Sequence, residues 1–181
     1  MTTLLRMIHA IDEHLEAALV PHAFGGALAL AYCIGEPRAT ADIDVNVFLR
    51  PDRVDTVLAA LPDEVGWDDE DRRILERDGQ ARLWWDRTPI DVFLSTTAFH
   101  DGAAARTHRE ELGGRTVPFL SCDDLAVFKA FFNRRKDWAD LEAMVRAERF
   151  DVDRAIGVIA RHLGPDDHRI AQLIELTQLD G

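Results

Sequence analysis

The 181-residue sequence has few cysteines, few basic residues and no long apolar run, and each shortage narrows what the chain can be. Only two cysteines occur, Cys33 and Cys122, both within apolar segments, and they predict buried thiols in a reducing compartment. Lys and Arg total 21 against 33 Asp and Glu, a formal net charge of −12. This charge argues against bulk DNA or RNA binding, which relies on neutralising phosphates, although a local basic groove stays open.

Other absences concern membranes and common cofactors. No apolar run is long enough to span a bilayer, and residues 1–20 mix charges into helical periodicity instead of forming a signal-peptide pattern. We therefore expect a cytoplasmic protein with no membrane partner. The seven histidines form no zinc-binding pattern and no Gly-x-Ser-x-Gly sequence is present, so neither a zinc enzyme nor a serine hydrolase is favoured.

Hydrophobic periodicity predicts an α/β core followed by helices. Apolar residues spaced by three and four, from Leu5 to Leu19, indicate a helix over residues 3–19, and alternation indicates strands at 42–49 and 88–95. Asp78-Gly79 stands between two strand-like runs and predicts a β-hairpin. The other expected elements are a strand at 22–24, an extended piece at 115–120, and helices at 27–34, 51–62, 97–111, 121–135, 137–147, 151–163 and 166–179. We expect residues 1–120 to form the core and residues 121–181 a helical region packed with it as one unit.

Three aspartates are candidates for metal ligands. Asp42 and Asp44 stand two residues apart in RATADIDVNVFL, so both project from the same face of a strand. Asp91 lies on another strand with the same alternation, and if the two strands are neighbours, three carboxylates converge. Such a cluster is unfavourable alone and becomes favourable around a divalent cation. Mg²⁺ prefers a few carboxylates plus water and phosphate, and two such ions can hold the attacking and leaving oxygens of a phosphoryl displacement.

Two glycines supply a second half of the site. Gly25-Gly26 joins a short strand to a helix N-terminus, where free backbone N–H groups attract phosphate. Without side chains, both positions allow a triphosphate to approach the backbone. The pair alone is weak evidence for such a site, but a Gly-Gly turn, a helix, an Asp-x-Asp strand and a third strand aspartate in that order are strong evidence.

On these residues, GGALALAYCIGEPRATADIDVNVF resembles the nucleotidyltransferase superfamily, whose fold is that of the polymerase β catalytic domain. The signature is a Gly-Gly or Gly-Ser turn, then Asp-x-Asp, then a later strand carboxylate. The form R-x-T-x-D-I-D is most similar to the branch that contains abortive-infection toxins. The segment KAFFNRRKDWADL is similar to that branch's Lys, Arg and Asp-x-x-Asp segment, matched here by Lys129, Arg135, Asp137 and Asp140. Small aminoglycoside nucleotidyltransferases share the core and are the rival branch.

The resemblance, which covers about residues 20–145, implies a role for each matched position. Asp42 and Asp44 would bind two Mg²⁺ ions, or Mn²⁺ in their place, and Asp91 would bind the catalytic ion and help to deprotonate the acceptor hydroxyl. Gly25 and Gly26 would hold the β and γ phosphates. The remaining nucleotide-binding candidates are Arg38, Thr40 and Lys129. Asp91 has no flanking motif, and Asp86 in WWDRTPID competes with it, but the alternation around Asp91 favours Asp91.

Simpler explanations exist for several of these residues. The Gly-Gly pair could be only a tight turn, Arg38 a loop charge, and Lys129 a solvated lysine on a helix face. For Asp137 and Asp140 the favoured explanation is that they cap and solvate a helix start. The acidic segment WDDEDRR lacks the glycine and terminal glutamate of a calcium loop and is expected to be a solvated connection. Trp84 and Trp85 are adjacent on a strand, so one should enter the core and the other face out.

The expected reaction is Mg²⁺-dependent transfer of a nucleoside monophosphate from an NTP to a hydroxyl group, with release of pyrophosphate. In the toxin-type branch the acceptor would be RNA or protein, with an antitoxin protein as a further partner. In the aminoglycoside-type branch it would be a small molecule, and the acidic net charge favours that choice. A third alternative is a non-catalytic nucleotide-binding module on the same fold. The complete carboxylate set argues against it.

Overall fold

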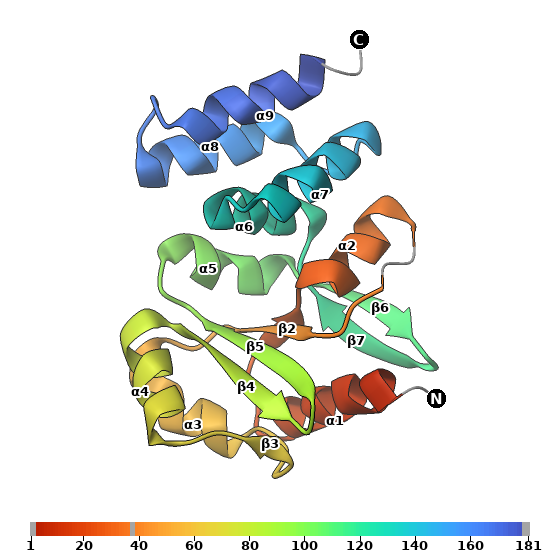
Figure 1. Ribbon diagram of the computed structural model, residues 1–181, viewed down its shortest axis with the longest axis vertical. Helices are drawn as coiled ribbons and strands as arrows, with labels where there is room; N and C mark the ends of the chain where they lie inside the picture. The colour runs from red at the N-terminus through yellow and green to blue at the C-terminus, as the bar shows by residue number, and fades with distance from the viewer. Residues whose placement is uncertain (1–2, 37–38, 179–181) are drawn as a thin grey trace. The chain divides into compact units, whose positions relative to one another are not determined.

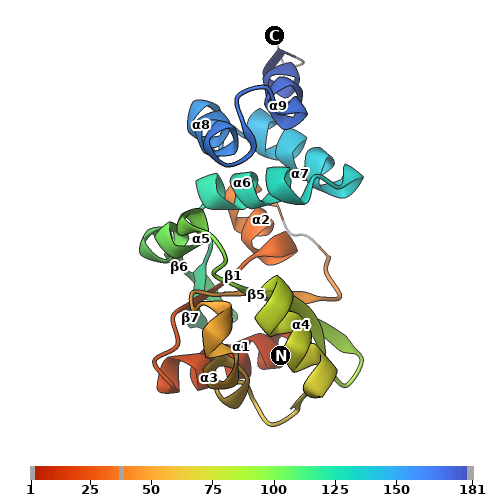
Figure 2. The same ribbon diagram turned by 90° about the vertical axis from the view of Figure 1, so that its left-hand side faces the viewer.

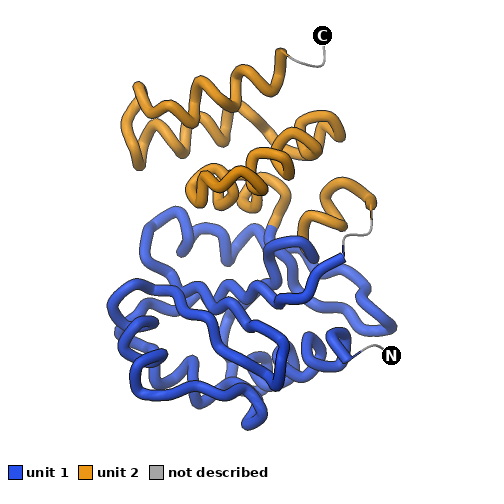
Figure 3. Tube along the Cα trace, viewed as in Figure 1, with its two compact units in different colours: residues 1–28, 39–120 blue, residues 29–38, 121–181 orange. Residues whose placement is uncertain are grey.

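The computed structural model describes residues 3–36 and 39–178 (Figure 1). Its chain divides into two compact units, drawn in different colours in Figure 3. The first unit consists of Met1–Leu28 and Ala39–Leu120, and the second of Ala29–Arg38 and Ser121–Gly181. All the strands in residues 3–36 and 39–178 belong to the first unit, so the α/β part and the helical part are described separately below.

Within the described residues, the first unit contains a mixed seven-stranded sheet in the order β3-β4-β5-β2-β1-β7-β6. The central neighbours β2 and β5 are parallel, as are β1 and β7, and the other pairs are antiparallel. This confirms the expected mixed α/β class. The strands are β1 (His22–Phe24), β2 (Ile43–Val47), β3 (Val65–Gly66), β4 (Gln80–Trp85), β5 (Thr88–Leu94), β6 (His108–Leu112) and β7 (Arg115–Phe119).

Alternation along β2 and β5 decides which side chains enter the core. From Ile43 in β2 and from Ile90 in β5, every second residue is β-branched or leucine and at most 1% exposed, whereas the residues between them face the other way. Side chains of a strand alternate between two faces, so this apolar set fixes the orientation of the polar set. The buried set is Ile43, Val45, Val47, Ile90, Val92 and Leu94.

Helices lie on both sides of this sheet. In Figures 1 and 2, α1 (Thr3–Ala17) and α3 (Val54–Ala59) lie on one side and α5 (Ala98–Ala103) on the other. The helix predicted over residues 3–19 is therefore confirmed, but it ends two residues early. Leu19 has a φ of 53° and is 90% exposed, so it is not part of the apolar face, and Val20 is buried instead.

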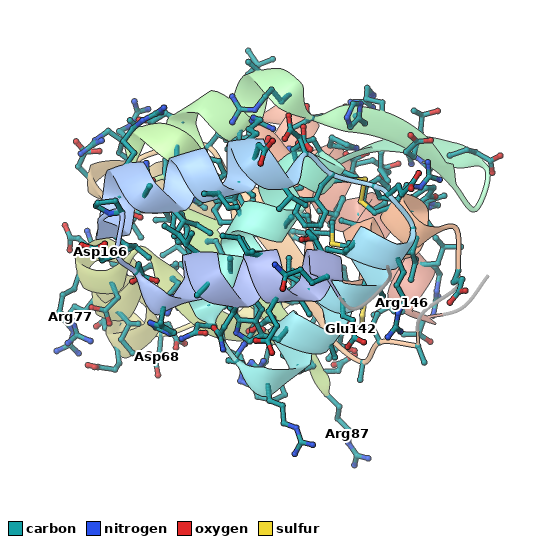
Figure 4. All side chains as sticks on the ribbon, turned by 90° about the horizontal axis from the view of Figure 1, so that it is seen from above. Asp68, Arg77, Arg87, Glu142, Arg146 and Asp166 are labelled. Carbon is teal, nitrogen blue, oxygen red and sulfur yellow. A yellow bond between two sulfur atoms is a disulfide. The ribbon has the colours of Figure 1, made fainter. Side chains whose placement is uncertain are left out.

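The hairpin predicted at Asp78-Gly79 is wrong. Residues before it form a helix, α4 (Asp69–Asp78), and Gly79 ends that helix with a φ of 70°. The acidic segment starts the helix: the Asp68 side chain accepts hydrogen bonds from the N–H groups of Glu70 and Asp71. Negative charge near a helix N-terminus is favourable, so this acidic segment caps α4 and is not a solvated connection. Figure 4 labels Asp68 and Arg77 near the two ends of α4.

The true hairpin joins β4 to β5 and turns at Asp86 and Arg87, where Asp86 has a φ of 53°. A second correction concerns residues 97–111, which were expected to be helical throughout. Only α5 and the short 3₁₀ turn η2 (Ala104–Arg106) are helical there, and β6 follows. Another 3₁₀ turn, η1 (Pro51–Arg53), precedes α3.

The second unit is helical, and its helices fall close to the predicted ranges. Ser121 caps α6 by accepting a hydrogen bond from the N–H of Asp124. None of the helices in residues 3–36 and 39–178 is long and apolar enough to cross a bilayer. The helices of this unit are α6 (Cys122–Phe132), α7 (Arg135–Arg146), α8 (Val152–Leu163), α9 (His168–Gln178) and most of α2 (Gly26–Ile34).

Cys33 and Cys122 form a disulfide in the second unit, drawn as a yellow bond in Figure 4. Their Cα atoms are 5.5 Å apart, in the usual range for such a bond. The prediction of two buried free thiols is therefore wrong. Apolar surroundings correctly indicated burial of Cys33, but its partner is 89 residues away in the sequence, and periodicity carries no information about contacts at that range.

A buried histidine on α5 makes the stability of the first unit depend on pH. His100 is 4% exposed and packs edge-on against Phe48, with ring centroids 5.8 Å apart. Burial lowers the pKa of His100 to about 4, against smaller opposing effects of Asp101 and the Leu94 backbone. The unfolded chain therefore takes up a proton near pH 6.5 that the folded chain resists until about pH 4.

We predict that the free energy of unfolding is not reduced by His100 above pH 6.5. It should fall as the pH drops from 6.5 toward 4, because the unfolded chain binds the proton more readily than the folded chain. At about 1.4 kcal/mol for each pKa unit, the loss is about 3 kcal/mol at most. Urea unfolding at pH 7 and pH 4.5 should show a smaller difference for His100→Gln than for wild type. The control His108→Gln changes an exposed histidine of β6 and should keep the wild-type pH dependence. Equal pH dependence in all three proteins would contradict the prediction.

Candidate active site

Asp44 and Asp91 lie directly opposite one another on neighbouring parallel strands. The register pairs Asp44 of β2 with Asp91 of β5, and it continues through Val45 with Val92. Registered partners in a sheet project from the same face, and the buried valines occupy the other. The structure therefore brings together two of the three carboxylates for which the sequence predicts a shared site.

The third carboxylate, Asp42, comes one residue before β2 and is held by a hydroxyl. Thr40 Oγ1 donates a hydrogen bond to Asp42 Oδ1 at 2.6 Å and lies 3.2 Å from the Asp42 carbonyl oxygen. This contact orients the Asp42 carboxylate and gives Thr40 a role in the described structure. Arg38, the other residue predicted near the pair, lies outside the described residues.

The glycine pair lies against the same carboxylates. The Gly25 N–H donates to the Asp44 carbonyl oxygen at 2.9 Å, which ties the turn to β2. A Cβ atom on Gly26 would lie 1.8 Å from Asp44 Oδ2, and one on Gly25 would lie 2.7 Å from Asn46 Nδ2. Gly26 also has a φ of 54°, which residues with side chains rarely adopt. Gly26 is therefore required by close packing on Asp44 and Gly25 by close packing on Asn46, and a plain turn would demand neither contact.

The competing candidate Asp86 lies elsewhere. It occupies the turn between β4 and β5, outside both strands, and it is exposed. Asp91 is 18% exposed in its side chain and stands within the ladder opposite Asp44. Of the two candidates, Asp91 is the one that shares a sheet face with the Asp-x-Asp pair.

Arg82 is a member of this cluster that the sequence did not reveal. It is the cross-strand partner of Asp91, and its Nε and Nη2 atoms donate to the two oxygens of that carboxylate, both at 2.7 Å. Its Nη2 atom also lies 3.9 Å from Asp42 Oδ2. A hairpin that turns at Asp86 and Arg87 places Arg82 opposite Asp91, so the misplaced hairpin at Asp78-Gly79 concealed the pairing.

The electrostatics of the cluster follow from these contacts. The pKa of Arg82 is raised well above its usual value, first by its hydrogen bonds to Asp91 and then by the charges of Asp91, Asp42 and Asp44. Each of these charges favours the protonated guanidinium, which stays charged over the whole physiological range. Arg82 therefore holds a fixed positive charge within the field of all three carboxylates.

The donor set suits Mg²⁺, which prefers carboxylate oxygens together with water and phosphate. Asp44 and Asp91 supply such oxygens on one face of the sheet, Asp42 directly precedes β2, and the Asp44 carboxylate packs against the glycine turn. As the side chains lie, no group of three Asp, Glu, His or Cys residues in the described part of the chain is close enough to hold an ion. Closing on an ion would require small movements of the carboxylates and of Arg82.

Lys129 belongs to the helical unit and has a partner there. Its Nζ atom lies 2.7 Å from Asp140 Oδ2, and the residue is buried, so it is not the solvated lysine that was one alternative. Asp137 accepts a hydrogen bond from the backbone N–H of Arg134 at the start of α7, which is the capping role favoured for it. The nucleotide contact expected of Lys129 stays a prediction.

A separate hollow of about 320 Å³ is lined by residues that include His22, Phe48, Arg109 and Pro118 but none of the three carboxylates Asp42, Asp44 and Asp91. His22 is buried and bonded to Asp12, with Nε2 3.0 Å from Oδ1. The hollow is therefore distinct from the carboxylate cluster.

The sequence matches, over residues 4–163, the family described as nucleotidyltransferase of unknown function, DUF6036. The match covers most of the chain. The protein belongs to this nucleotidyltransferase family. The resemblance inferred from the glycine turn and the aspartates is thus confirmed at the level of the superfamily. The abortive-infection branch is not shown by it.

Solved structures share the fold of this nucleotidyltransferase. The solution structure of the antibiotic-resistance factor ANT(2'')-Ia matches with a TM-score of 0.57 and 15% identity, covering 98% of this chain and 91% of that one. Its crystal structure in complex with adenylyl-2''-tobramycin matches with a TM-score of 0.55 and 15% identity, covering 99% of this chain and 100% of that one. An antigenic nucleotidyltransferase-like protein from Paracoccidioides brasiliensis matches with a TM-score of 0.56 and 12% identity, covering 97% of this chain and 88% of that one. No curated protein matches the sequence significantly.

A substitution at Gly26 should distinguish two roles of this glycine: support of the Asp44 carboxylate and accommodation of a left-handed backbone. We predict that Gly26→Ala weakens Mn²⁺ and NTP binding by about tenfold or more, the loss typical of disturbed support for a metal ligand. The reason is that the new Cβ must push the Asp44 carboxylate aside. Isothermal titration and thermal melting measure binding and stability in parallel.

The control is Gly35→Ala, because Gly35 has a φ of 72° but nothing within 4 Å of its Cβ position. Both variants should lose about 1–2 kcal/mol of stability from the left-handed conformation. Only Gly26→Ala should lose affinity. If both variants bind as wild type does, Gly26 is only a tight turn.

Proposed function

We propose that this nucleotidyltransferase uses Mg²⁺ to transfer a nucleoside monophosphate from an NTP to a hydroxyl acceptor. The observation that carries the proposal is the placement of Asp44 between Asp91, its partner across the strands, and Gly26, whose missing side chain admits the Asp44 carboxylate. A structural turn would not need this packing. A site that holds a cation beside a triphosphate needs both the paired carboxylates and the glycine next to them. Mn²⁺ would serve in place of Mg²⁺.

Each residue has a distinct part in the proposed reaction. Asp42 and Asp44 hold two ions with Asp91, and Thr40 keeps the Asp42 carboxylate oriented through its 2.6 Å hydrogen bond. When bound, the ions supply charge that stabilises the attacking and leaving oxygens. The backbone at Gly25 and Gly26, where α2 begins, binds the β and γ phosphates, since a helix N-terminus attracts anions.

In the proposed transfer one bond to the α phosphorus forms, one breaks, and Asp91 takes the proton. The acceptor oxygen forms a bond to the α phosphorus while the bond between that phosphorus and the bridging oxygen to the β phosphate breaks. Asp91 accepts the proton of the acceptor hydroxyl, and pyrophosphate leaves with the electron pair of the broken bond. The carboxylates of this face thus hold the reactants in line and receive the proton.

Two acceptor classes remain to be separated by experiment. The similarity of R-x-T-x-D-I-D and the Lys129 segment to toxin-type enzymes favours RNA or protein, with an antitoxin as partner. The net charge of −12 favours a cationic small molecule, and the fold neighbour ANT(2'')-Ia is described with adenylyl-2''-tobramycin. Trp84, two residues from Arg82 on β4 and 47% exposed, offers an aromatic surface on the same sheet face for a ring of either acceptor.

A cytoplasmic location follows from the proposed use of an NTP. The disulfide between Cys33 and Cys122 weighs against this location, because disulfides persist mainly in oxidising compartments, and the proposed location therefore rests on the NTP alone.

The reaction is tested by replacing one carboxylate without changing its shape. We predict that Asp44→Asn or Asp91→Asn lowers transfer on the order of 100- to 1,000-fold, as when one stabilising group of a transition state is lost. The measurement is release of pyrophosphate and labelled product from each of the four NTPs with Mg²⁺. Asp63→Asn alters an exposed carboxylate outside the cluster and should retain full activity.

The same assay identifies the acceptor when total RNA, cell lysate or an aminoglycoside is supplied. Label on a macromolecule supports the toxin-type acceptor, and label only on small molecules supports the other. Wild-type activity in Asp44→Asn at saturating Mg²⁺, or binding of NTP without any transfer under every condition, would contradict the proposed enzyme and favour a nucleotide-binding module.

A further inference from the structure

Arg82 occupies the position that a cation would take beside Asp91. Its planar guanidinium meets the Asp91 carboxylate edge to edge, with both donor–acceptor distances at 2.7 Å. Such a paired arrangement uses both carboxylate oxygens at once and is the strongest geometry available to arginine. The third carboxylate, Asp42, lies 3.9 Å from the same guanidinium.

The same contacts conflict with ion binding. A divalent ion bound by Asp91 needs one of the two oxygens that Arg82 occupies, and a guanidinium held 2.7 Å from those oxygens would repel the ion. The two cations therefore cannot both be in direct contact with Asp91 at full strength. Binding of one weakens binding of the other.

The arginine is the more exposed partner of the pair. Its side chain is 51% exposed, so water can solvate the guanidinium when the pair opens, and this hydration offsets part of the cost of breaking the two-pronged contact. The Asp91 side chain is only 18% exposed and is fixed in the strand ladder opposite Asp44. A long, half-exposed side chain can rotate into solvent, whereas the strand carboxylate stays in place.

We propose that Arg82 is the resident counter-cation of the carboxylate cluster and that it competes directly with divalent cations for Asp91. The inference rests on the proposed function. Without an ion, Arg82 compensates the three carboxylates and holds Asp91 in its orientation. When an ion binds, the guanidinium withdraws, so that Arg82 sets the concentration of ion at which the site fills. Arg82 is thus a positioning residue of the metal-free state.

The decisive experiment measures Mn²⁺ binding to the full chain by electron paramagnetic resonance, with no nucleotide present. Arg82→Gln should bind Mn²⁺ about threefold to fivefold more tightly than wild type, the size expected for removal of a half-exposed competing pair. Arg82→Lys should fall between the two, because lysine keeps the charge but loses the two-pronged contact. Arg87→Gln is the matched control: Arg87 is exposed in the turn of the same hairpin and is labelled in Figure 4.

A second readout does not depend on variant folding. In wild-type protein, the Nε–Hε signal of Arg82 in a nitrogen–proton correlation spectrum, assigned by its loss in Arg82→Lys, should move when Mg²⁺ is added. The signal of Arg87, assigned through Arg87→Gln, should not. Movement of the Arg82 signal supports displacement of the guanidinium from Asp91.

The possible outcomes separate this inference from the proposed function. If wild type binds Mn²⁺ and Arg82→Gln binds it equally or more weakly, the competition is disproved while the proposed enzyme stands. If Arg82→Lys matches wild type while Arg82→Gln binds more tightly, a general field effect explains the gain and direct competition is disproved. If no variant binds Mn²⁺, even with an NTP analogue present, the metal site fails and the proposed function fails with it.

Discussion

Parallel pairing of β2 with β5 is the constraint on which the rest of the site depends. Burial of the alternate apolar residues in both strands forces the residues between them onto the opposite face. The register then places Asp44 and Asp91 side by side. A shift of either strand by one residue would turn its carboxylate into the core and its apolar residues out, so the hydrophobic pattern fixes the carboxylates' shared face as firmly as it fixes the fold.

Two neighbouring features make this crowding of like charge tolerable. The absence of a side chain at Gly26 lets the Asp44 carboxylate lie directly against the start of α2, where helix N–H groups favour negative charge. Arg82 neutralises Asp91 from the adjacent antiparallel strand. Together they offset the repulsion between neighbouring carboxylates on this face of the sheet. The proposed chemistry uses the same two features, one as a phosphate cradle and the other as a cation competitor.

The sequence predicted the parts of this site that follow from local patterns. Alternation placed Asp44 and Asp91 on strands, and the order of glycine turn, helix and Asp-x-Asp strand indicated the nucleotidyltransferase superfamily, which the family match confirms. What it missed depends on contacts between distant segments or on competing local signals. Asp78-Gly79 suits a helix C-cap as well as a hairpin, and the capping by Asp68 decided for the helix. That error hid Arg82, and the pairing of Cys33 with Cys122 carried no local signal at all.

The central claim is that Asp42, Asp44 and Asp91 form a divalent-cation site from which Arg82 must withdraw. The most direct test is anomalous diffraction from crystals grown with Mn²⁺ and a non-hydrolysable NTP analogue. The account predicts a manganese peak bridging these carboxylates, triphosphate density against Gly25 and Gly26, and an Arg82 guanidinium no longer paired with Asp91. Manganese and nucleotide bound at another surface, with the Arg82–Asp91 pair intact, would contradict it.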